Sequence, residues 1–405
     1  MSTQAAVLVT DIPQAKPSHR KLANRTLNAA ATFWFVVAVL GQLLFAFSIA
    51  AFYGLAAARG NWQLWNRVMT HGHIAGQPVG NLVVAIHLVS AVIILLSGAL
   101  QLTPQVLRRA PMFHRWNGRV YMVTAFSVSL AGLYLMWVRG STGDLSQHIG
   151  QSLDAVLIMA CAVMALRTAL ARNFKIHRRW ALRLFLVVSA SLFIRAGVFL
   201  ATIINQGPFG YDPVTLTGPF LTFIAFAQSL FPLAVLEIYL RTQDRAGAAG
   251  RFAMAAGLFV LTIVMGAGVL TVSAASFVPS IKIAFDSRKP IGQTLSDTIA
   301  TGGIDQAIAQ YHQLKAAVPA EYNFDEEQLN NLGYELIRAK KFDQAILIFQ
   351  LNIEAYPQSA NVYDSLGEGY MDAGDKPQAI ANYQRSLQLN PKSSGAVKML
   401  RLLQK

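Results

Sequence analysis

The chain has 405 residues, of which 54% are hydrophobic and only 13% are charged, and its formal net charge is +14. An average soluble domain carries roughly a quarter charged residues, so this composition argues against an ordinary soluble globule, a disordered chain and a collagen-like fibre. The single cysteine, Cys161, excludes a disulfide framework and any zinc or iron–sulfur site that needs several cysteines.

Seven long apolar runs dominate the first two thirds of the chain. A hydrocarbon core of about 30 Å needs ~20 apolar residues in one helix, and each run reaches about that length. The predicted spans are 28–57, 81–103, 116–138, 148–170, 181–204, 218–240 and 252–276. Because the runs lack the two-residue alternation of a membrane barrel, we predict an all-α fold with a seven-helix transmembrane bundle over residues 28–276.

Basic residues alternate between the segments that flank these runs. From the N-terminus onward, the segments contain 4, 2, 4, 1, 6, 0 and 3 Lys and Arg, which is 17 against 3 for alternate segments. Lys and Arg concentrate on the cytoplasmic side of membrane proteins. We therefore predict a multi-pass protein of the bacterial inner membrane, with a cytoplasmic tail at residues 1–27 and an exported C-terminal part. Topology explains the positive charge, and we expect no nucleic-acid partner.

The C-terminal part changes in composition and contains a repeat. Residues 282–405 carry 13 basic and 14 acidic residues. Two prolines predict a linker over 277–290, and residues 291–405 follow as a second domain. A period of 34 residues then links four kinds of position: Leu332-Gly333 recurs as Leu366-Gly367, Ala345 as Ala379, Phe349 as Tyr383 and Pro357 as Pro391.

This period resembles the tetratricopeptide repeat, a pair of antiparallel helices that stacks into a helical solenoid. The resemblance covers two full units over residues 326–392. An earlier, degenerate unit is predicted from Ala307, Tyr311 and Pro319, which keep the internal spacing. The last residues, 393–405, predict a capping helix with Val397, Leu400 and Leu403 facing inward.

The resemblance implies a protein or peptide partner at the groove that the first helix of each unit lines. By register it points to two sets of residues. They are Glu327, Asn330, Tyr334 and Arg338, then Asn361, Asp364, Glu368 and Asp372. The second set is acidic, which favours a basic or polar segment; the alternative is an ordinary solvated helix face.

Four histidines fall at two predicted depths of the bundle. His87 and His148 lie towards the outer ends of their spans, and His114 and His177 lie at the inner entries. Their order resembles that of the transmembrane di-haem b-type cytochromes, in which alternate helices supply the two ligands of each haem. The resemblance implies two haem b groups, each with two imidazole ligands to the iron. The outer haem would use His87 and His148, and the inner one His114 and His177.

Two observations favour other interpretations. His114 and His177 stand in basic sequence typical of a loop, so they could be interfacial anchors that touch lipid phosphates. Residues 25–280 as a whole resemble a bacterial family of predicted multi-pass membrane proteins of unknown function, on the strength of the histidine–arginine pairs of the inner loops. That family implies no chemistry.

Arg195 interrupts the apolar run 181–204. A charge within a span is costly and usually faces a partner or a water-filled cavity. We expect either Asp154, at a similar predicted depth, or a bound anionic cofactor to lie beside it. The alternative is that the side chain extends towards the outer membrane surface.

Together these patterns predict a membrane protein whose exported repeats dock a partner protein. The bundle would be a di-haem electron-transfer unit, and thus a transmembrane oxidoreductase or electron carrier. In the alternative, it is a haem-free anchor or small-ligand sensor that organises an extracytoplasmic complex. A transporter with a polar path along Arg195 and the histidines is a third hypothesis.

Overall fold

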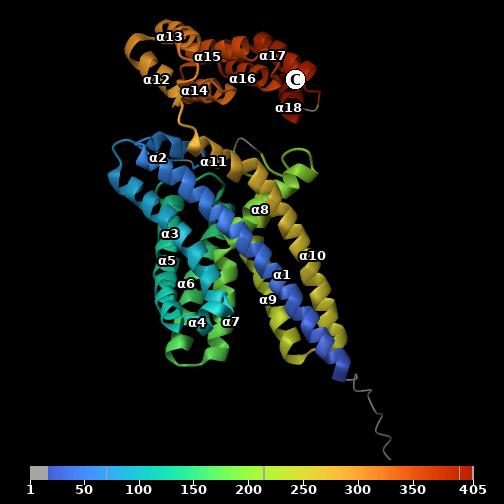
Figure 1. Ribbon diagram of the computed structural model, residues 1–405. Coiled ribbons are helices and arrows are strands. Elements are labelled where there is room, and N and C mark those ends of the chain that lie inside the picture. The colour runs from blue at the N-terminus through green and yellow to red at the C-terminus, as the bar shows by residue number, and fades with distance from the viewer. Residues whose placement is uncertain (1–16, 70, 213–214, 392, 404–405) are drawn as a thin grey trace, which may run out of the picture. The chain divides into compact units, whose positions relative to one another are not determined.

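The computed structural model describes residues 17–69, 71–212, 215–391 and 393–403 (Figure 1). Their regular structure is helical except for one pair of two-residue strands, which confirms the all-α prediction. Two compact units divide the chain between Phe285 and Asp286.

Proline and capping side chains set where several helices of the first unit begin. Pro78, Pro111 and Pro219 each stand at the start of a helix, where a missing N–H costs nothing. The side chain of Asp144 accepts the N–H of Gln147 at 2.9 Å and caps another helix. The helices are α1 (Pro17–Ile49), α2 (Leu55–Ala58), α3 (Pro78–Leu102), α4 (Pro104–Arg109), α5 (Pro111–Trp137), α6 (Leu145–Leu170), α7 (Phe174–Val188), α8 (Ala190–Ile204), α9 (Pro219–Arg245), α10 (Ala248–Val272) and α11 (Val278–Phe285). Short irregular turns link some of them: π-helical Ala50–Gly54 and Ser273–Phe277, and 3-10 helical Trp62–Arg67.

The predicted spans are all helical. Within the described residues, six stretches are long and apolar enough to cross a membrane. They are His19–Ala58, Pro78–Leu102, Pro111–Trp137, Leu145–Leu170, Pro219–Arg245 and Ala248–Phe285. The fifth predicted span is the pair α7 and α8, which bends by 44° and makes a seventh crossing when it counts as one span.

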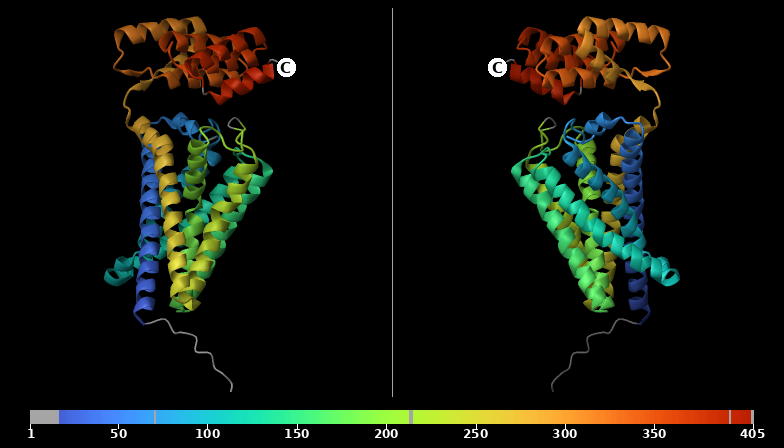
Figure 2. Two further views of the ribbon diagram at one scale, coloured as in Figure 1. Left: turned by 90° about the vertical axis from the view of Figure 1, so that its right-hand side faces the viewer. Right: turned by 90° about the vertical axis from the view of Figure 1, so that its left-hand side faces the viewer.

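The helices run between two ends of the first unit (Figures 1 and 2). At one end, called the near end here, lie the start of α1, helix α4, the start of α7 and the turn between α9 and α10. At the far end lie α2, the last turn of α8 and α11. The four segments rich in Lys and Arg therefore share the near end.

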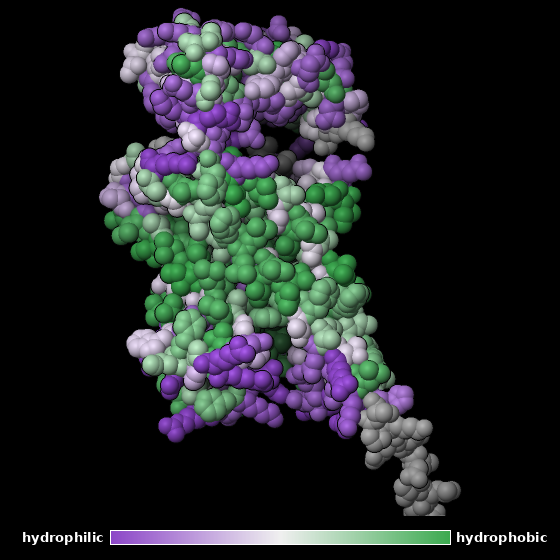
Figure 3. Space-filling view, in the orientation of Figure 1, coloured by the Kyte–Doolittle hydropathy of each residue, from purple (hydrophilic) through white to green (hydrophobic). Residues whose placement is uncertain are grey.

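The surface of the first unit has the pattern that a lipid environment requires. A broad hydrophobic band covers it between the two ends, and hydrophilic residues gather at the near end (Figure 3). Large apolar side chains of the long helices are exposed: Val123 of α5 by 66%, Phe223 of α9 by 67% and Leu270 of α10 by 72%. An apolar surface of this extent would be unstable in water and is stabilised by contact with lipid.

The interior of the unit is assembled from helix pairs. Helix α1 packs along α10, α3 along α5, and α6 along α7. The bend between α7 and α8 falls at Ser189, which is fully buried. Gln42 of α1 donates a hydrogen bond of 2.5 Å to the Ser189 hydroxyl, so the bend is attached to the first helix.

The predicted linker over 277–290 is wrong in its first part. Residues 278–285 form α11, which continues the helical stretch of α10. Pro279 lacks the N–H that a regular α-helix would need. The π-helical turn Ser273–Phe277 directly precedes it, and the wider turn lets the helix continue past the proline.

The second unit is a stack of helix pairs. Two short parallel strands, β1 (Lys289–Pro290) and β2 (Tyr322–Asn323), tie its first pair together, with Lys289 opposite Tyr322. Its helices are α12 (Ile291–Gly302), α13 (Ile304–Ala317), α14 (Glu326–Arg338), α15 (Phe342–Ala355), α16 (Ala360–Asp372), α17 (Lys376–Leu389) and α18 (Ser394–Leu403). Each helix contacts its successor within a pair, as in a solenoid.

The repeat positions form the core of this unit, as the sequence predicts. Each second helix buries one alanine and, four residues later, one aromatic ring, with no more than 1% of either exposed. These pairs are Ala307 and Tyr311, Ala345 and Phe349, and Ala379 and Tyr383. The degenerate first unit is therefore a true helix pair.

The capping helix is also present. In α18, Leu400 is buried and Val397 and Leu403 are half-buried, in agreement with the prediction. Ala396 is the most buried residue of this helix and was not predicted.

Candidate functional site

The groove of the repeat unit brings several predicted residues together. Tyr334 on α14 reaches across to α16, where its hydroxyl donates to the Glu368 carboxylate at 2.7 Å and lies 3.1 Å from the Ser365 hydroxyl. Burial and the charge of Glu368 raise the pKa of Tyr334, so the phenol stays a donor. The two predicted sets thus meet at this contact.

Asp364 and Asn330 contribute polar atoms that have no partner in the described structure. Oδ1 of each side chain is buried and makes no hydrogen bond. Burial, together with the charge on Glu368, raises the pKa of Asp364 to about 6. Burial also raises the pKa of Glu368 and of Asp372. The groove therefore concentrates acidic groups, of which Asp364 has a buried oxygen without a donor among the described residues.

The remaining predicted residues lie at the margins. Glu327, Arg338 and Asn361 are exposed, and Asn361 donates to the Glu326 carboxylate at 2.8 Å. Register alone did not reveal Glu326 or Ser365 as members of the groove, because their contacts depend on how one unit packs on the next. The sequence does indicate the acidic part of the groove. Asp364, Glu368 and Asp372 are spaced by four residues, so their carboxylates lie one turn apart on α16.

We expect the repeat unit to gain stability as the pH falls from 7 to 5. The folded unit holds the Asp364 proton up to about pH 6, while the unfolded chain releases it near pH 3.8. The folded state therefore binds more protons between these values, and stability falls as the pH rises through them. Because the side chain is partly exposed, screening reduces the effect to about 1 kcal/mol.

Calorimetry of the full chain in detergent at pH 7 and pH 5 measures this shift. Asp364→Asn should stabilise the unit at pH 7 and weaken the pH dependence, whereas the exposed Asp343→Asn should leave both unchanged. A pH dependence that survives in Asp364→Asn would assign it to other groups.

In the first unit, the predicted outer histidines do not share a depth. His87 lies nine residues after the start of α3, and His148 three residues after the start of α6. At 1.5 Å per residue this difference is about 9 Å along the helices. His87 donates through Nδ1 to the Val128 carbonyl at 3.2 Å, while Nε2 of His148 lies 3.2 Å from the Ser141 hydroxyl. The arrangement does not fit one haem between them.

The predicted inner histidines are placed alike. His114 and His177 each lie three residues after the start of a helix at the near end. His177 donates through Nδ1 to the Ala165 carbonyl at 2.9 Å. Among the described residues, Nε2 of His177 has no hydrogen-bond partner, and Nδ1 of His114 is buried without one. Their depth and free nitrogens fit a pair of axial ligands.

Arg195 does not pair with Asp154. Its Nη1 donates to the Ser191 carbonyl at 2.6 Å, and its guanidinium lies 4.8 Å from the centroid of the Phe45 ring. The Asp154 carboxylate instead accepts a hydrogen bond from Ser229 of α9. The predicted ion pair is wrong because Asp154 faces α9, whereas Arg195 faces α1.

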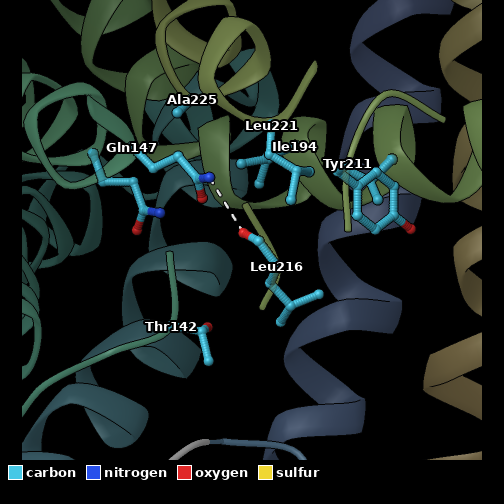
Figure 4. Close-up of a pocket in the computed structure, with 9 residues that line it drawn as sticks. Thr142, Gln147, Ile194, Tyr211, Leu216, Leu221 and Ala225 are labelled. Atoms are coloured by element: carbon cyan, nitrogen blue, oxygen red, sulfur yellow. Dashed lines mark hydrogen bonds between the residues drawn. The ribbon is translucent and has the colours of Figure 1, made fainter. Parts of the chain in front are cut away.

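A small pocket lies at the far end of the unit, between α6, α8, α9 and the segment that joins α8 to α9 (Figure 4). Its volume is about 220 Å³. Gln147 donates to the Leu216 carbonyl at 3.2 Å at its edge. Its lining residues carry no formal charge: Thr142, Gln147, Gln151, Ile194, Val198, Tyr211, Leu216, Leu221 and Ala225. Across the described part of the chain, no group of three or more His, Cys, Asp or Glu side chains could hold a metal ion.

Comparison with known families recognises both parts of the chain. Residues 84–231 match the family described as predicted membrane protein (DUF2306), and residues 360–393 match the tetratricopeptide repeat. The chain contains a DUF2306 membrane region followed by a tetratricopeptide repeat. A comparison with curated proteins finds no match.

The DUF2306 match covers the polar groups of the bundle described above. It runs from α3 into α9 and so includes the four histidines, Arg195 and the pocket. Helices α1 and α10 lie outside it, although α1 supplies the aromatic ring beside Arg195. The tetratricopeptide match covers α16 and α17, which carry the acidic part of the groove.

Proposed function

We propose that this multi-pass membrane protein uses its repeat groove to bind a basic segment of a partner protein. The observation that carries the proposal is the half-buried carboxylate of Asp364, whose Oδ1 has no donor in the described structure. Tetratricopeptide repeats are interaction modules that bind along their first helices. A Lys or Arg side chain of a partner would supply the missing donor and the opposite charge.

Glu368 and Asp372 extend the same acidic face along α16. Among the described residues, no Lys or Arg forms an ion pair with Asp364, Glu368 or Asp372. Burial raises their pKa values because it disfavours the charged forms, and for Glu368 the hydrogen bond from Tyr334 offsets only part of this effect. A basic ligand would lower these pKa values, so its binding should weaken as the pH falls below about 6.

A labelled hexalysine peptide tests the proposal on the full chain in mild detergent. The triple variant Asp364→Asn, Glu368→Gln, Asp372→Asn should bind it at least about tenfold more weakly. The reason is that each exposed ion pair lost from the complex contributes about 1 kcal/mol to binding. The matched triple variant Asp297→Asn, Asp305→Asn, Asp343→Asn changes the same net charge outside the groove and should keep full affinity. Equal losses in the two variants would place binding elsewhere.

We also propose that the near end of the bundle faces the cytoplasm and that the repeats are exported from a bacterial cell. The positive-inside rule supports this orientation, because the four segments rich in Lys and Arg share the near end, whereas α11, the last helix of the first unit, lies at the far end. A phosphatase fused after Ser393 should be active. An inactive fusion, with an active cytoplasmic reporter at the same site, would refute the orientation.

The role of the bundle is a separate proposal. Electron transfer through haem at the near end is supported by the inner histidines, since His114 and His177 could hold one group, which would supply a reversible one-electron centre. Nothing supports a second haem between His87 and His148. A reduced-minus-oxidised visible spectrum should show bands that disappear in His177→Ala. A colourless protein made with adequate haem favours the haem-free anchor or sensor.

A further inference from the structure

We infer that the bundle binds an anionic amphiphile through Arg195, with one carboxylate or phosphate on the guanidinium and a hydrocarbon tail among the surrounding helices. Arg195 lies nine residues before the end of α8 at the far end. At 1.5 Å per residue this is about 13 Å inside the helix end. The backbone of Arg195 therefore lies well inside the span rather than at its end.

Arg195 lacks a compensating charge. An arginine cannot release its proton in a protein, and an uncompensated charge in an apolar interior costs several kcal/mol. No carboxylate of the described residues lies within ion-pair distance, and Asp154, nine residues into α6, bonds to Ser229 instead. Within the described part of the chain, the guanidinium makes one hydrogen bond, to the Ser191 carbonyl, which uses one of its five donors.

The guanidinium is accessible to a ligand. The side chain of Arg195 is exposed, so its remaining donors are not all covered by packed side chains. An accessible, unpaired cation within a membrane-spanning helix is the arrangement that an anionic group would stabilise.

The side chains near Arg195 indicate the rest of the ligand. Phe45 lies under the guanidinium and stacks on Phe277 at 5.0 Å. Both rings belong to the hydrophobic core cluster of this unit, as do Leu192, Leu88 and Phe52. Apolar surroundings of this kind could not replace the hydration shell of a small ion, whereas an amphiphile needs donors at one end only.

The backbone around the site is irregular in a way that supports binding. Tyr53 stands in the π-helical turn Ala50–Gly54, and Phe277 stands in the π-helical turn Ser273–Phe277. Single π-helical turns often occur at functional sites, because they re-aim the side chains that they carry. Here the second turn presents the Phe277 ring to Phe45, on which the guanidinium of Arg195 stacks.

Thermal unfolding of the full chain in a non-ionic detergent tests the proposal. Tryptophan fluorescence reports the first unit, because all six tryptophans lie before residue 181. Dodecanoate or dodecyl phosphate should raise the melting temperature. If dodecanoate acts at the lower concentration, the ligand is a fatty acid; if dodecyl phosphate does, the ligand is a lipid phosphate. Dodecanol and acetate should have no effect, since each lacks either the charge or the tail.

Three variants make the test specific. Arg195→Gln should need at least about tenfold more dodecanoate for the same shift, and its ligand-free melting temperature should rise by about 2–4 °C because the uncompensated charge is gone. Arg195→Lys should keep part of the response. Arg119→Gln removes a cation stacked at 4.6 Å on Trp116, on an exposed face, and should respond like the parent.

The opposite results would overturn the proposal. An Arg195→Gln protein that responds to dodecanoate like the parent would show that binding does not involve the guanidinium. A lower ligand-free melting temperature in Arg195→Gln, with no response of the parent to either anion, would make Arg195 a structural residue. A full response to acetate would exclude the hydrocarbon tail from recognition.

Discussion

Replacing Phe349 by alanine is expected to destabilise the repeat unit by about 3–5 kcal/mol, the usual cost of removing a buried phenylalanine ring. The ring is fully buried and lies 5.3 Å from the Tyr334 ring, edge to face. It also fills the space that Gly333 leaves, since a Cβ there would meet the ring at 2.3 Å. The cavity left by Phe349→Ala would therefore open between both helices of one repeat and reach the groove.

Calorimetry of the full chain in detergent should show the transition of the repeat unit at a lower temperature. Leu402→Ala provides the matched control, because that side chain is 57% exposed on α18 and its loss should cost less than about 0.5 kcal/mol. The tryptophan signal of the first unit should not move in either variant. Equal stability of Phe349→Ala and the parent would contradict the buried position of the ring.

The sequence predicts the repeat unit almost completely because packing there is local. The alanine and aromatic positions recur at fixed spacing, and each meets a neighbour one helix away. The same holds for helix starts such as Pro78 and Pro111, where proline fixes the backbone without help from the rest of the fold. Periodicity and proline therefore carry most of the information about these elements.

The polar groups of the bundle could be predicted only in part. Hydropathy locates a span to within a few residues, and the predicted starts at 81 and 148 lie three residues inside α3 and α6. The predicted spans therefore already separate His87 from His148 by six residues, and only their order along the chain grouped them as a pair. The partner of Arg195 depends on helix rotation, which brings Asp154 to Ser229 and turns Arg195 to Phe45. Neither rotation has a signal in a single sequence.

The expected result of Gly268→Val is a loosened contact between α10 and α8. A Cβ at Gly268 would lie 2.9 Å from the Ala196 carbonyl oxygen and 3.0 Å from the Ala196 Cβ, and backbone cannot give way as a side chain can. Overpacking of this kind costs about 1–3 kcal/mol. Ala196 follows Arg195 directly, so the displacement should also disturb the guanidinium, and the melting temperature and the dodecanoate response should both fall.

Gly257→Val separates this contact from a general effect of valine in the same helix. A Cβ at Gly257 meets nothing within 4 Å, so the substitution adds a lipid-exposed side chain to α10 without a clash. Its melting temperature should stay the same or rise slightly, because glycine is the poorer helix former. A loss in Gly257→Val as large as that in Gly268→Val would mean that valine disturbs α10 itself, and the close approach of α8 and α10 would no longer explain the result.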